Sequence, residues 1–181
     1  MKPSFIHLTL FFVFSISLNN IVLGQEKQLH YSINQDMYSN FSKAFETLDY
    51  NLFASIHSQD MIRISGGNGG AIKKVKEYLK GYQKRWGTPA KKPSPIDFRL
   101  FERVTSDSLV SDRGIYRITY VNNDKETKYS YGQFHVLLRL EKGHWKILID
   151  YDSNENKTID KKSYDSAFAL TNYEKYWVHK N

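Results

Sequence analysis

The chain has 181 residues, no cysteine, and 26 Lys and Arg against 19 Asp and Glu, for a net charge of +7. The lack of cysteine excludes disulfides, thiolate nucleophiles and Cys-ligated metal sites. This length fits one domain with a sizeable core. The basic residues are scattered along the chain. Because the N-terminus also indicates export, these residues do not indicate a nucleic-acid partner.

The N-terminus has the features of a secretory signal peptide. Lys2 precedes an apolar run over 5–18 and a small-residue exit. The run is shorter than the roughly 20 apolar residues that span a bilayer, although 21–23 would extend it into an uncleaved anchor. We expect 1–24 to be removed before Gln25, leaving 157 residues with no membrane span. The mature protein is then secreted or periplasmic.

A first amphipathic helix is predicted after a linker over 25–32. Between Ile33 and Phe53 the apolar residues recur at spacings of three and four, the period of a helix. They are Met37, Phe41, Ala44, Phe45, Leu48 and Leu52.

A short strand and a second helix follow. Alternation over 60–65 predicts the strand, and the glycines of 66–70 predict a turn. The helical period then returns from Ile72 to Trp86, and Gly87 with Pro89 ends it.

Four longer alternating segments, 96–104, 109–121, 129–141 and 145–151, predict an antiparallel meander because their connections are short. One parity is apolar and should face the helices. Its members include Ile96, Phe98, Leu100, Val104, Tyr116, Phe134, Val136, Trp145, Ile147, Ile149 and Tyr151. The other parity predicts a basic outer face of Arg99, Arg103, Arg113, Arg117, His135, Arg139 and Lys146.

The last part of the chain, 154–181, is expected to be an extension, with a helical spacing over 163–177 compatible with one more helix. Residues 152–160 resemble the start of a calcium loop. However, Lys157 stands where that loop needs glycine, and Ser163 where it needs a closing glutamate. A polar connector is the favoured interpretation, and no metal site is expected.

Three short patterns together resemble the nuclear transport factor 2-like superfamily, and within it the SnoaL-like group. They are Ala44-Phe45-x3-Asp49-Tyr50-x-Leu52 ending in Asp60, Gly70-Ala71-Ile72, and Trp145-Lys146-Ile147-x2-Asp150-x2-Ser153 after Gly143. The resemblance covers residues 33–153. It implies an α+β fold in which a curved antiparallel sheet wraps two to three N-terminal helices as a cone with an open end. Members include isomerases, dehydratases, polyketide cyclases and toxin-immunity proteins, so the fold alone assigns no function.

Catalytic candidates are few. Isomerases of this fold combine a carboxylate base with a tyrosine and a protonated acid. The candidates for such a set are Asp60, Asp150, Tyr38, Tyr116 and Tyr151. The enzyme alternative is Asp60 acting with Tyr116 or His57. A turn role for Asp60 and a helix-end role for His57 are the favoured alternatives. Asp150 shares the parity of Lys146, which predicts that it faces away from the cavity. The sequence does not support catalysis.

The sequence indicates a tyrosine-rich pocket more clearly than a catalytic site. Burying a phenol is costly unless its hydroxyl has a partner or borders solvent, so several on one apolar face suggest a lined cavity. An ordinary aromatic core is the open alternative. The predicted lining is Tyr78, Tyr82, Trp86, Tyr116, Tyr120 and Tyr151.

Taken together, the sequence predicts an exported domain that binds a small, mainly apolar ligand without a cofactor. A homodimer through the outer sheet face is a further expectation. A proton-transfer enzyme and a non-catalytic interaction module remain as alternatives.

Overall fold

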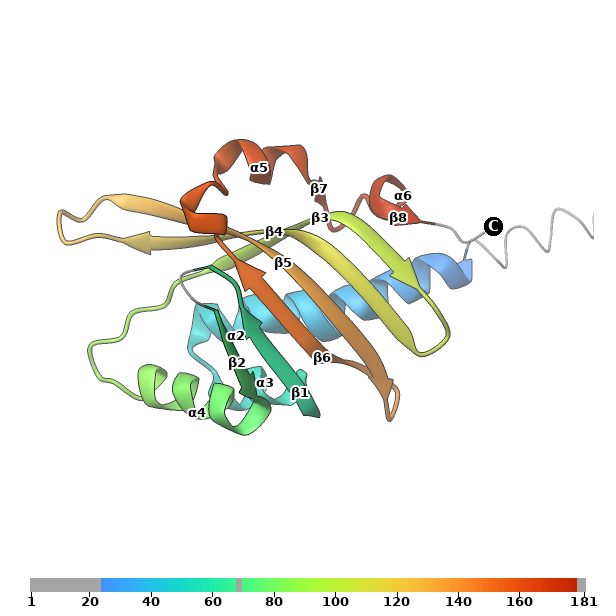
Figure 1. Ribbon diagram of the computed structural model, residues 1–181, viewed down its shortest axis with the longest axis horizontal. Coiled ribbons are helices and arrows are strands. Elements are labelled where there is room, and N and C mark those ends of the chain that lie inside the picture. Colours follow the sequence, from blue (N-terminus) through green and yellow to red (C-terminus); the bar gives the residue numbers. More distant parts are fainter. Residues whose placement is uncertain (1–23, 68–69, 179–181) are drawn as a thin grey trace, which may run out of the picture.

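The computed structural model describes residues 24–67 and 70–178. Of the predicted signal segment 1–24, all but Gly24 therefore lies outside the described residues. A helical N-terminal region packs inside a curved sheet, and a C-terminal segment lies on the outer side of that sheet (Figure 1).

The N-terminal helical region is longer than predicted and is broken. Residues 24–33 are helical where a linker was expected, because His30 and Ile33 are buried against the core. The π-helix η1 (Asn34–Ser39) and α2 (Asn40–Thr47) follow. Leu48 then adopts a left-handed φ of 57°. Asp49 caps the N-terminus of α3 (Tyr50–Ser55), and its carboxylate accepts a hydrogen bond from the Leu52 amide.

The second predicted helix starts later than its pattern indicated. Strand β1 (His57–Ser65) is followed by β2 (Ala71–Lys74), and only then by α4 (Val75–Trp86). Ile72 pairs with Ile64 in antiparallel β2–β1 and is 75% exposed. Although Ile72 fits the helical period, it belongs to a strand, because pairing with β1 satisfies the backbone hydrogen bonds of this segment.

The long strands are β3 (Ile96–Thr105), β4 (Leu109–Val121), β5 (Thr127–Glu141) and β6 (His144–Ser153), each within two residues of its predicted bounds. The sheet order is β2-β1-β6-β5-β4-β3-β7, with β1 parallel to β6 and the long neighbours antiparallel. This curved, unclosed sheet around helices confirms the predicted α+β cone (Figure 1).

The C-terminal extension forms several short elements instead of one helix. They are η2 (Glu155–Lys157), α5 (Lys161–Ser166), β7 (Phe168–Ala169), α6 (Tyr173–Tyr176) and β8 (Trp177–Val178). Both short strands pair with β3, and Tyr164 packs on Ile115 of the outer sheet face. Within the described residues, no helix has the length and apolarity to cross a membrane.

The predicted basic outer face is wrong at one position, because β3 contains a bulge. Leu100 pairs with Gly114 and Glu102 pairs with Arg113, so Phe101 is an extra residue that inverts the parity after it. Arg103 consequently points inward and is fully buried. Its Nε donates to Asp112 Oδ1 at 2.8 Å, and the Tyr38 hydroxyl donates to Oδ2 of the same carboxylate at 2.7 Å.

Candidate functional site

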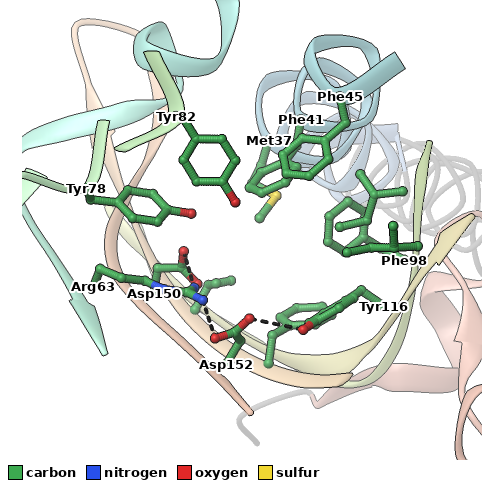
Figure 2. A pocket seen from close by; sticks show the side chains of 14 residues that line it. Met37, Phe41, Phe45, Arg63, Tyr78, Tyr82, Phe98, Tyr116, Asp150 and Asp152 are labelled. Carbon is green, nitrogen blue, oxygen red and sulfur yellow. Dashed lines mark hydrogen bonds and ion pairs between the residues drawn. The ribbon is translucent and has the colours of Figure 1, made fainter. Parts of the chain in front are cut away.

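A cavity of about 70 Å³ lies between the helices and the concave face of the sheet (Figure 2). Its wall has two parts. One part is apolar, and the other gathers phenol, carboxylate and guanidinium groups. The lining residues are Met37, Phe41, Phe45, Arg63, Tyr78, Tyr82, Ile96, Phe98, Tyr116, Ile118, Phe134, Val136, Asp150 and Asp152.

The two carboxylates enter the cavity because of a bulge in β6. Leu138 pairs with Ile147 and Leu137 with Ile149, so Leu148 is an extra residue. Beyond it, Asp150 is buried and lines the cavity, whereas Ile149 is 36% exposed. The prediction that Asp150 faces away, drawn from uninterrupted alternation, is therefore wrong.

Arg63 connects the two carboxylates. It pairs in register with Asp150 across parallel β1 and β6, and its Nη1 lies 2.6 Å from Asp150 Oδ2. Its Nη2 contacts Asp152 Oδ1 (Figure 2). Burial raises the pKa of Asp150, and Arg63 opposes that increase. Although burial opposes its charge, Arg63 has a raised pKa because of the neighbouring carboxylates.

Three tyrosines complete the polar part of the wall. The Tyr116 hydroxyl donates to Asp152 Oδ2 at 3.1 Å. The hydroxyls of Tyr78 and Tyr82, both on α4, point toward the cavity near Asp150 (Figure 2). Burial is the main cause of a raised pKa in all three. They are therefore neutral phenols at ordinary pH, able both to donate and to accept hydrogen bonds.

Of the five tyrosines and one tryptophan predicted to line the pocket, the cavity wall includes Tyr78, Tyr82 and Tyr116. Trp86 lies beside it, with its ring 5.2 Å from that of Phe45. Tyr120 is 40% exposed near the far end of β4. The β6 bulge turns Tyr151 to the opposite face from Asp150, where its hydroxyl donates to Glu155 at 3.0 Å.

The three catalytic candidates do not meet at the cavity, since Tyr116 alone among them lines it. His57 is buried beside Phe53 and Tyr78, and its Nδ1 lies 2.7 Å from the Phe53 carbonyl oxygen. Asp60 is largely exposed and forms an ion pair with Arg139 at 2.9 Å.

Sequence reasoning missed Arg63, Asp150 and Asp152 as a unit. The available signal was two acids spaced by two in the last long strand, together with an arginine in the first. The described His, Asp and Glu side chains form no group suited to holding a metal ion.

Comparison with known proteins gives matches in structure only. No protein-family model and no curated protein matches the chain. A nuclear transport factor 2-like protein of unknown function from Shewanella oneidensis aligns with TM-score 0.53 and 19% identity, over 66% of this chain and 98% of its own.

Two further solved structures agree. A ketosteroid isomerase-like protein from Erwinia carotovora atroseptica has TM-score 0.51 and 19% identity, over 68% of this chain and 93% of its own. A nuclear transport factor 2-like protein of unknown function from Pseudomonas putida has TM-score 0.53 and 15% identity, over 70% and 86%. Together with the helix-filled curved sheet, these matches show that the chain has the nuclear transport factor 2-like fold.

Proposed function

We propose that this domain binds a small, mainly apolar ligand with one uncharged polar end. The proposal rests on the division of the cavity wall into an apolar side and a polar side. Met37, Phe41 and Phe98 offer an apolar surface, and the opposite side offers buried phenols beside Asp150. Ligand pockets commonly combine such apolar walls with a few convergent polar groups.

The polar end of the ligand is inferred to be a hydroxyl or carbonyl group. Arg63 pairs with both carboxylates of the cavity and balances one of their two negative charges, so an anionic ligand end would be repelled here. The hydroxyls of Tyr78 and Tyr82 remain close to the open space (Figure 2). A neutral partner can bond to these phenols without bringing an unpaired charge into a buried site.

The size of the cavity limits what enters it. One water needs about 10–15 Å³ on this scale, so 70 Å³ holds roughly five non-hydrogen atoms. The inserted part is therefore a slender chain end or a small group, and a larger ligand must extend beyond the cavity.

A panel of alcohols, ketones and carboxylic acids, tested by thermal shift and calorimetry, checks this function. Tyr82→Phe and Tyr116→Phe are expected to weaken a hydroxyl-bearing ligand about fivefold, the effect of one hydrogen bond near 1 kcal/mol. Tyr120→Phe removes a phenol outside the cavity wall and should leave affinity unchanged. If the folded protein binds none of these compounds, the cone is a packed core and the interaction-module alternative gains support.

Proton transfer is a second candidate, favoured by one observation. Asp150 is a buried carboxyl with a raised pKa, and it lies beside a cavity that fits a carbonyl group. If it acts as a base, exchange of α-protons of a bound ketone with D2O, followed by NMR, should disappear in Asp150→Asn while binding persists. Equal exchange in the variant would exclude this role.

Export and dimer formation belong to the same proposal. The basic N-terminus and the apolar run over 5–18 support export by a cleaved signal peptide. The N-terminal residue of the purified protein tests this, because Gln25, free or cyclised, supports cleavage, and Met1 in a membrane fraction contradicts it. Sedimentation analysis tests the homodimer.

A further inference from the structure

A groove of about 560 Å³ adjoins the cavity. It lies between the end of α2, the end of α4 and the loop that follows α4. Phe45, Tyr82 and Ile118 line both spaces, so they form the wall that the groove and the cavity share. The outer lining also includes Leu48 and Trp86.

The rim of this groove is cationic. Arg85 and Lys91 line it, and no Asp or Glu belongs to its lining. Among the described residues, neither side chain takes part in an ion pair. Two unneutralised cations beside an apolar surface attract an anion that also has apolar parts.

Arg85 is held close to this shared wall. Its guanidinium carbon lies 4.2 Å from the centre of the Tyr82 ring, a cation–π contact. The hydroxyl end of the same ring points toward the cavity (Figure 2). One tyrosine therefore separates a cationic outer position from a neutral hydrogen-bonding inner one.

We propose, building on the function above, that the ligand is an amphiphilic carboxylate. Its carboxylate lies at the rim near Arg85 and Lys91, and its apolar body crosses Phe45, Trp86 and Ile118. A hydroxyl or carbonyl at its other end enters the cavity. The inner end is slender because the cavity admits roughly five non-hydrogen atoms.

Matched compounds separate the two parts of this assignment. The probes are 10-hydroxydecanoate, decanoate and 1,10-decanediol, titrated by calorimetry and by the fluorescence change expected from Trp86 in the groove. The hydroxy acid should bind most tightly. Its advantage over the diol should be about fivefold at low salt and should fall as ionic strength rises, because the rim is open to solvent.

Three charge variants of equal net charge locate the carboxylate. Arg85→Gln and Lys91→Gln should each reduce the preference for the acid over the diol. Lys84→Gln, an exposed neighbour on α4 outside the groove lining, should not. Each substituted side chain is exposed, so the fold should be retained, as circular dichroism will show.

The outcomes are distinguishable. If the acid and the diol bind equally, or if Lys84→Gln has the same effect as Arg85→Gln, the carboxylate assignment is wrong while ligand binding stands. If decanoate binds as tightly as 10-hydroxydecanoate, the hydroxyl does not use the cavity. If none of the three compounds binds, the proposed function fails together with this inference.

Discussion

Tyr116 lies directly across Gly132, its cross-strand partner. A Cβ atom at Gly132 would be 2.4 Å from the Tyr116 hydroxyl oxygen and 2.5 Å from its Cζ. The missing side chain on β5 therefore lets the ring of Tyr116 cross this strand and donate to Asp152 on β6. A glycine, which has no side chain, thus positions one hydroxyl of the candidate site.

Gly132→Ala should displace Tyr116. We expect a loss of about 1–3 kcal/mol in the free energy of unfolding, the usual cost of overpacking, together with the ligand-affinity loss of Tyr116→Phe. Gly81→Ala is the control, because nothing lies within 4 Å of its added Cβ in α4, and it should be neutral or stabilising. If Tyr116→Ala does not relieve the cost of Gly132→Ala, the two residues are not coupled as described.

Arg63→Met should destabilise the domain by about 3–5 kcal/mol, because it leaves Asp150 and Asp152 adjacent and without their cation. Adding Asp150→Asn to that variant should recover part of the loss. Urea unfolding of the two single variants and the double variant measures this coupling. Additive effects would show that the ion pair contributes little.

His57 should make stability depend on acid pH. Burial lowers its pKa from 6.5 to about 4, so between these values the unfolded chain binds a proton that the folded chain does not. Stability should fall by up to roughly 3 kcal/mol as pH decreases through this window. The raised pKa of Asp150 acts in the opposite direction, so the wild-type slope alone is not diagnostic.

The measurement is therefore a difference in unfolding free energy between wild type and His57→Asn at pH 7, 5.5 and 4.5. Asparagine keeps a donor for the Phe53 carbonyl and does not titrate. The variant should lose less stability than wild type on acidification. The exposed His135→Asn serves as the control and should follow wild type.

A comparison of Arg103 with Arg113 measures how burial changes the contribution of an ion pair to stability. Arg103 and Asp112 are fully buried, whereas Arg113 and Glu102 are 54% and 32% exposed. Arg103→Met should cost about 3–5 kcal/mol because Asp112 keeps a buried charge, and Arg113→Met less than about 1 kcal/mol. Thermal unfolding of both variants would refute this account if their midpoints were equal.

Much of the fold could be predicted because its signals are local. Alternation located all four long strands to within two residues, and helical spacing located α4 from Val75 onward. The N-terminal helix was predicted too short, because the burial of His30 depends on packing against distant residues, including Tyr173 and Trp177.

The sequence predicted only a part of the site. Tyr78 and Tyr82 were assigned correctly to an inner helix face, since helical spacing is regular along α4. Asp150 and Tyr151 were assigned to opposite sides of the sheet from those they occupy. Parity along a strand is reliable only up to the first bulge, and the bulge at Leu148 is recorded in the pairing of β6 with β5, not in the residues of β6 alone.

By itself, the sequence determined the absence of cysteine, the order of the four long strands and the tyrosine-rich helix. Tertiary structure alone decided which polar groups face the cavity. Bulges in β3 and β6 turned Arg103, Asp150 and Asp152 inward, and Gly132 made room for Tyr116 to reach Asp152. The physical reason is that side-chain direction in a sheet depends on register with the neighbouring strand, which the strand's own sequence does not specify.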